Sequence, residues 1–186
     1  MDKTWIALAL TGAASLANAA GFTLMSPDIK ANSTIDRKFE ANLFGCTGEN
    51  KSPALKWNGA PPDTKSFAVT VFDPDAPTGS GFWHWFVYNI PAGMTQLPAN
   101  AGAAGGANLP KGAVQNRSDY DVAAWGGPCP PQGDKPHRYV FTVHALNTDK
   151  LELPPDATAA VAGAKVNART IAKATFTAKY GRAKAK

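Results

Sequence analysis

The stretch DPDAPTGSGFWHWFVYNIPA, from Asp73 to Ala92, decides the fold of this chain. An apolar run, Phe67 to Phe72, precedes it, and the segment His84 to Ile90 inside it is a second run of strand-forming residues between Pro and Gly clusters. Two carboxylates and a histidine therefore fall where neighbouring strands end or begin. Polar side chains held at strand ends by a rigid scaffold are typical of binding sites.

A second segment, GPCPPQGDKPHRY from Gly127 to Tyr139, has the same construction. Its Pro and Gly residues precede the alternating strand pattern YVFTVHAL, Tyr139 to Leu146. We interpret the two segments as two halves of one polar pocket. The stretch between them, Pro98 to Trp125, is rich in Gly, Ala and Asn and too long for a tight turn, so we expect it to wall that pocket.

The remaining patterns predict a mainly β protein, an antiparallel sandwich with one late helix packed on the sheet. The helix is expected from Ala157 to Lys173, which is rich in alanine and follows the start signal Leu153 to Asp156. Further strands are expected in three short runs separated by Pro, Gly and Asn clusters, namely Phe22 to Leu24, Leu55 to Trp57 and Thr175 to Tyr180.

The first 19 residues have the pattern of a signal peptide. Lys3 precedes an apolar stretch, Trp5 to Leu16, and the small residues of Ala17 to Ala19 fit a cleavage site. The alternative interpretation is a buried N-terminal helix. The apolar stretch is too short to be a membrane span, which needs ~20 residues. We expect a periplasmic or secreted protein whose residues 20–186 form a single domain with a basic C-terminal tail.

The chain has a net charge of +5, and much of the excess lies near the C-terminus. Such a cluster could bind nucleic acid or an anionic membrane. We expect a solvated helix face and tail, and no nucleic-acid partner. The residues concerned are Lys165, Arg169, Lys173, Lys179, Arg182, Lys184 and Lys186.

Cys46 and Cys129 are the only cysteines, and both lie in loops that contain glycine. An even count in an exported chain allows a disulfide, whereas two buried thiols are the alternative. The sequence alone does not decide between them. Neither cysteine has a second one at metal-ligand spacing, so no metal site is expected.

DPDAP, HWFVYNIP and GPCPPQGDKPHRYVFTVHAL, together with SPALKWNGAP from Ser52 to Pro61, resemble the signatures of the phosphatidylethanolamine-binding protein family. The short link TGSGFW before His84 is similar to the bacterial, Raf-kinase-inhibitor-like branch. The resemblance covers nearly all of the chain after the signal peptide. It implies a compact β-fold with a small pocket for phosphate-like anions and phospholipid headgroups, and no cofactor.

Carried over by motif, the resemblance implies a ligand-binding site. The imidazoles, the Tyr139 hydroxyl and the backbone amides around Gly127 and Cys129 would donate hydrogen bonds to an anion. The carboxylates would orient a histidine or pair with an ammonium group. Arg138 is expected on the opposite face as an ion-pair partner. The site residues implied are Asp73, Asp75, Pro77, His84, Pro130, His137 and Tyr139.

The sequence thus favours an exported, non-enzymatic protein that binds a small anion. The alternative is a modulator that acts on protein partners and whose pocket is regulatory or vestigial. A metal-dependent hydrolase is less favoured because no HExxH-like motif is present, and a serine hydrolase because no GxSxG motif is. His144, in the middle of a predicted strand, is expected to be an ordinary residue of the sheet face.

Overall fold

The computed structural model of the protein describes residues 21–184, so the predicted signal peptide lies outside the described residues. Short strands dominate, as the Pro, Gly and Asn punctuation of the sequence predicts. In chain order the elements are β1 (Thr23–Met25), the 3₁₀ helix η1 (Arg37–Phe39), β2 (Leu55–Asn58), β3 (Ser66–Asp73), β4 (Phe82–Pro91), β5 (Gln96–Leu97), β6 (Val114–Gln115), β7 (His137–Leu146), α1 (Ala159–Asn167) and β8 (Thr170–Tyr180).

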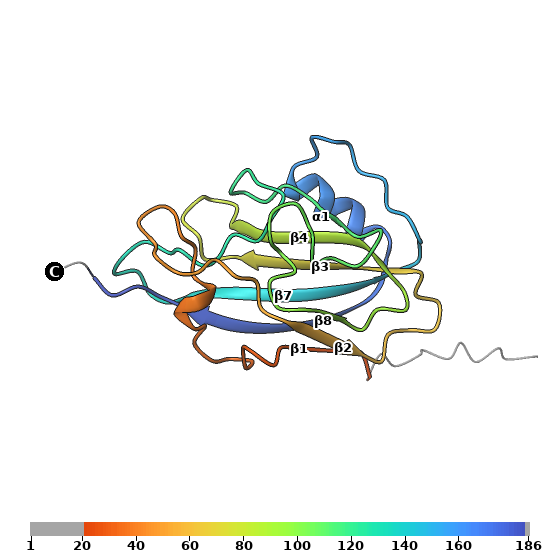
Figure 1. Cartoon of the computed structure of the whole chain (residues 1–186), viewed down its shortest axis with the longest axis horizontal. Helices are drawn as coiled ribbons and strands as arrows, with labels where there is room; N and C mark the ends of the chain where they lie inside the picture. The colour runs from red at the N-terminus through yellow and green to blue at the C-terminus, as the bar shows by residue number, and fades with distance from the viewer. Residues whose placement is uncertain (1–20, 185–186) are drawn as a thin grey trace, which may run out of the picture.

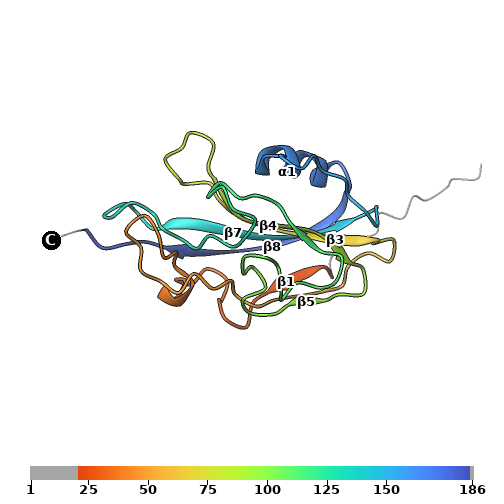
Figure 2. The same ribbon diagram turned by 45° about the horizontal axis from the view of Figure 1, so that its top comes forward.

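The strands form two sheets that pack face to face (Figures 1 and 2). The larger sheet has the order β6-β4-β3-β7-β8 and the smaller one β1-β2-β5, with antiparallel pairing throughout. Helix α1 lies on the outer face of the larger sheet (Figure 2). The mainly β fold with a late helix on the sheet, predicted from the sequence, is confirmed.

Alternation along the strands divides the apolar residues between the two faces of the larger sheet. In β7, Tyr139, Phe141 and Val143 point into the main core between the sheets, whereas Leu146 packs in a second cluster with Ala162 and other residues under α1. Burial of one such aromatic or aliphatic side chain contributes about 1.5–3 kcal/mol. The main core therefore holds β3, β4 and β7 rigidly, and these three strands carry the site described below.

The predicted end of the helix was wrong. Helix α1 begins after Thr158, whose side chain accepts a hydrogen bond from the Val161 N–H, and it ends at Asn167. Thr170 begins strand β8 and pairs with Leu146, the last residue of β7. The alanines on both sides of this boundary suggest a continuous helix, but an open edge of β7 offers ladder hydrogen bonds that the helix cannot match. Within residues 21–184, no helix is long and apolar enough to cross a membrane.

Cys46 and Cys129 form a disulfide, with their Cα atoms 6.0 Å apart and 83 positions separating them in the sequence. The bond joins the loop after η1 to the loop before β7. Arg182 reinforces this junction, since its Nη2 donates to the Gly45 carbonyl at 2.9 Å and its Nη1 to the Pro130 carbonyl at 3.3 Å. Of the two states that the sequence left open, the structure contains the disulfide.

Candidate functional site

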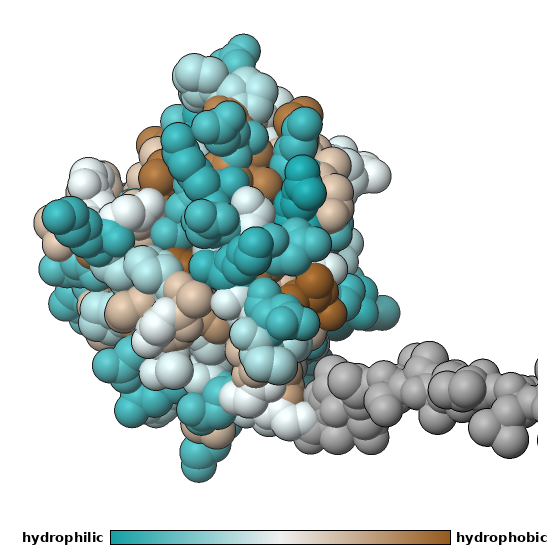
Figure 3. Space-filling view, turned by 90° about the vertical axis from the view of Figure 1, so that its right-hand side faces the viewer, coloured by the Kyte–Doolittle hydropathy of each residue, from teal (hydrophilic) through white to brown (hydrophobic). Residues whose placement is uncertain are grey.

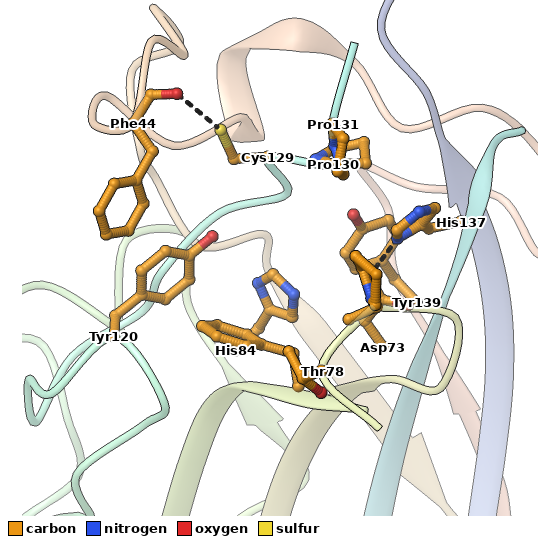
Figure 4. Close-up of a pocket in the computed structure, with 13 residues that line it drawn as sticks. Phe44, Asp73, Thr78, His84, Tyr120, Cys129, Pro130, Pro131, His137 and Tyr139 are labelled. Atoms are coloured by element: carbon orange, nitrogen blue, oxygen red, sulfur yellow. Dashed lines mark hydrogen bonds and ion pairs between the residues drawn. The ribbon is translucent and has the colours of Figure 1, made fainter. Parts of the chain in front are cut away.

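A cavity of about 150 Å³ lies where β3 ends and β4 and β7 begin (Figure 4). We refer to it as the strand-end cavity. The opposite end of the sheets, near α1, presents mainly hydrophilic side chains (Figure 3). The residues that line the cavity are Phe44, Asp73, Ala76, Pro77, Thr78, Phe82, His84, Tyr120, Cys129, Pro130, Pro131, His137 and Tyr139.

All of the predicted site residues except Asp75 line the strand-end cavity. Asp75 instead accepts hydrogen bonds from Arg138, through the backbone N–H at 2.8 Å and through the guanidinium at 2.7 and 2.9 Å. These hydrogen bonds lower the pKa of Asp75 to about 2. Arg138 thus forms the structural ion pair that was expected of it, and Asp75 is its partner. The two halves of the predicted pocket do meet.

Asp73 and His137 form a buried hydrogen-bonded pair at the centre of the site. Antiparallel pairing places the last residue of β3 near the first residue of β7, and Asp73 Oδ2 lies 2.7 Å from His137 Nδ1. Their side chains are only 3% and 6% exposed. The other carboxylate oxygen accepts the Asp75 N–H at 2.8 Å. Asp73 therefore orients the imidazole, and each of its oxygens already accepts one hydrogen bond.

A β-bulge places His84 in the strand-end cavity. In the pairing of β3 with β4, Val71 faces Trp85 and Phe72 faces Trp83, so His84 is the extra residue. Without the bulge, His84 would point away from the face that Trp85 occupies. With it, both side chains turn toward the inner face, where Trp85 lies in the core and His84 reaches the cavity. The alternating pattern of the sequence contains no signal for this shift.

The His84 ring is held as a neutral imidazole. Its Nδ1 lies 2.7 Å from the Gly126 carbonyl oxygen, which can only accept, so Nδ1 carries the proton. Burial lowers the pKa of His84 to about 4, although the nearby Asp73 carboxylate opposes this effect. At neutral pH the second nitrogen, Nε2, therefore has a free lone pair. It is available to a group that enters the cavity.

The Tyr139 hydroxyl is a buried polar group without a partner. The residue is completely buried, and within residues 21–184 the hydroxyl has no hydrogen-bond partner. Burial, together with the negative charge of Asp73, raises the pKa of this hydroxyl, so it stays protonated. An unsatisfied buried hydroxyl costs about 1–3 kcal/mol. A ligand that accepts its hydrogen bond would recover that free energy.

The segment Pro98 to Trp125, expected to wall the pocket, contributes Tyr120 to the lining. The Tyr120 hydroxyl donates to the Gly127 carbonyl at 2.8 Å, and the ring lies so close to Gly126 that a Cβ there would be 1.9 Å from it. The expectation that the Gly127 amide serves a ligand was wrong. Its N–H donates to the Asn50 side chain at 2.8 Å, because the loop after η1 packs against it.

Sequence reasoning missed the apolar side of the cavity. Phe44 is 77% exposed at the cavity mouth, and its ring stacks on Tyr120 with centroids 6.0 Å apart. Phe82 meets Tyr120 edge to face at 4.8 Å. Only the disulfide could have indicated Phe44 beforehand, since Cys46 follows it by two positions. The other lining residues not foreseen are Ala76, Thr78 and Pro131, whereas Cys129, expected near the anion, does line the cavity.

His144 lies on the outer face of the larger sheet, away from the cavity. Its ring nitrogens face the Thr70 and Thr170 hydroxyls at 3.5 and 3.3 Å, and burial lowers its pKa to about 4. These contacts agree with its expected role as a residue of the sheet face. Within residues 21–184, no group of three or more His, Cys, Asp or Glu side chains is arranged to hold a metal ion.

The sequence profile of the phosphatidylethanolamine-binding protein family matches residues 25–181. The match begins at the last residue of β1 and covers every other strand and every segment that lines the strand-end cavity. The chain therefore belongs to the phosphatidylethanolamine-binding protein family.

Two relatives come from Escherichia coli (strain K12). YbcL is 51% identical over 164 residues, which cover 88% of this chain and 90% of YbcL. YbhB is 41% identical over 157 residues, covering 84% and 98% of the two chains. The crystal structure of YbcL, described as a new member of the mammalian family, superimposes with a TM-score of 0.84 over 86% of this chain and 98% of YbcL. The crystal structure of a homologue from Chlamydia trachomatis, which is 27% identical, superimposes with a TM-score of 0.72 over 87% of this chain and 98% of the homologue.

Proposed function

We propose that the protein is an exported, non-enzymatic binding protein whose strand-end cavity accepts a small phosphate-like anion. The observation that carries the proposal is the Tyr139 hydroxyl, a buried donor with no partner among residues 21–184, in a residue that lines a cavity together with two histidines. The family name refers to a phospholipid, which suggests a phosphorylated headgroup as the source of the anion. Export rests on the signal-peptide pattern of residues 1–19.

Three donors can serve the anion. Tyr139 offers its hydroxyl, as described above. His137 Nε2, which lies 3.6 Å from the Asp134 carboxylate, donates when the ring is doubly protonated, since Nδ1 already donates to Asp73. His84 Nε2 donates once the ring takes up a proton, which a bound anion favours. The walls, formed by Pro77, Pro130 and other rigid residues, lose little conformational entropy on binding.

We expect anion binding to be coupled to proton uptake at His84. In the free protein this pKa is about 4, and a neighbouring anion raises it, so the complex holds more protons than the free protein above pH 4. Affinity should therefore rise as the pH falls from about 8 to about 5, by at most about tenfold per pH unit. Sulfate is the suitable probe because its own charge is constant over this range.

The test is isothermal titration of the mature protein with sulfate and with inorganic phosphate at both ends of that pH range. Saturable binding that is tighter at low pH supports the proposal, and His84→Gln should reduce the pH slope because a glutamine does not titrate. His144→Gln is the matched control, because His144 has a similarly low pKa but lies outside the cavity. Absence of saturable binding by either anion would refute the anion site.

A further inference from the structure

The strand-end cavity has two chemically different sides. Figure 4 shows Asp73, His137 and Tyr139 on one side and Phe44 and Tyr120 on the other, with His84 between them. The polar side offers hydrogen-bonding groups. The other side offers the faces of aromatic rings, and proline rings complete the lining. A ligand that fills both sides must carry an apolar group beside its anionic one.

Phe44 forms the outer edge of the apolar side, and its exposure and backbone strain raise the free energy of the ligand-free protein. Its side chain is 77% exposed, so most of the apolar surface faces water. Its backbone has φ +53°, in the left-handed region that non-glycine residues rarely occupy. A ring kept exposed in a strained conformation gains free energy only when another group covers it.

Phe44 is fixed in this position from its C-terminal side. The next residue, Gly45, accepts a hydrogen bond from Arg182 at 2.9 Å, and the residue after it, Cys46, is bonded to Cys129. Cys129 itself lines the cavity. The ring is thus preorganised relative to the polar side, so that a ligand does not bear the entropy of ordering it.

The shape of the apolar side favours a flat group. The rings of Phe44 and Tyr120 are inclined by only 20°, and Phe82 stands edge-on to Tyr120 at an interplanar angle of 75°. Aromatic rings pack well on such surfaces in offset-stacked and edge-to-face arrangements. A cavity of ~150 Å³ can hold a benzene ring. The volume of about 150 Å³ found here thus admits a small anionic group and part of a ring at the mouth.

Building on the proposed function, we infer that the ligand is an aryl phosphate, in which an aromatic ring is attached to the anionic group, and that Phe44 selects this ligand by stacking. Phe44 is thus a specificity-determining residue. The phosphate occupies the polar side beside Tyr139 and His137. The ring leaves the cavity between Phe44 and Tyr120.

The test compares phenyl phosphate with methyl phosphate, two monoesters with the same anionic group, by isothermal titration. The wild-type protein should bind phenyl phosphate about threefold to tenfold more tightly, the range expected for one aromatic contact. Phe44→Ala should remove this preference by weakening phenyl phosphate binding more than methyl phosphate binding, and Phe44→Leu should restore little of it. Met25→Ala is the matched control, since Met25 is also exposed, at 53%, but lies on β1.

The outcomes separate this inference from the proposed function. Equal binding of both esters would overturn the stacking role of Phe44 and leave the anion site intact. Tighter binding of phosphocholine than of phenyl phosphate would also overturn it, because the rings would then serve a cation. Binding of neither ester would refute the anion site, and the inference with it.

Discussion

Replacement of His137 by alanine is expected to abolish phosphate binding and to lower the free energy of unfolding by about 3–5 kcal/mol. The stability loss follows from the buried pair described above. Without the imidazole, the carboxylate of Asp73, with a side chain only 3% exposed, loses the partner that lies 2.7 Å away. The binding loss follows because the same ring lines the polar side of the strand-end cavity. Urea unfolding and isothermal titration with phosphate measure the two effects.

The control for His137→Ala is Arg138→Ala, at the next position of the same strand. Arg138 also pairs with an aspartate, but this pair is exposed and Asp75 does not line the cavity. We expect little change in either stability or phosphate affinity, because water solvates the freed Asp75. His137→Asn tests binding separately from stability, since an amide can still donate to Asp73. A folded His137→Ala protein that binds phosphate as the wild type does would remove His137 from the site.

Loss of the disulfide is expected to lower the free energy of unfolding by ~4–5 kcal/mol. The bond closes a loop of 83 positions, and its removal restores conformational entropy to the unfolded chain. Urea unfolding with and without dithiothreitol measures the effect, and the double substitution Cys46→Ser with Cys129→Ser reproduces it without a reductant. Since Cys129 lines the cavity, we also expect a weaker preference for phenyl phosphate.

A stability change below about 1 kcal/mol on reduction would contradict this account. It would mean that the reduced unfolded chain keeps residual order, so that the bond removes little further conformational entropy from it. The slope of the urea unfolding curve distinguishes this case, because a more compact unfolded chain lowers it.

The sequence allowed the strands to be predicted because their signals are local. Phe67 to Phe72 and Tyr139 to Leu146 alternate or run apolar between Pro and Gly clusters, and both form buried strands. The predicted end of the helix was wrong because the signal that sets it is long-range. Alanines continue past Asn167, and only the long-range pairing of Thr170 with Leu146 shows where β8 begins.

The polar side of the site was predictable from motifs, whereas the apolar side was not. Asp73 and His137 stand at the ends of recognisable strands, so their proximity follows from the antiparallel sheet. His84 reaches the cavity only through a β-bulge, which the composition of the strand does not indicate. Phe44 and Tyr120 come from loops that are placed by the disulfide and by the close approach of Tyr120 to Gly126.

The central claim is that the strand-end cavity binds a small phosphate-like anion. Its most direct test is a phosphate and phosphoethanolamine titration of the mature, metal-stripped protein, followed by backbone amide and histidine NMR shifts. We predict saturable shifts at the residues that line the cavity, clustered at Asp73, His84 and residues 127–139, in the wild-type protein, and their loss in His137→Ala. Shifts that do not saturate at millimolar ligand, or that cluster elsewhere, would contradict the account.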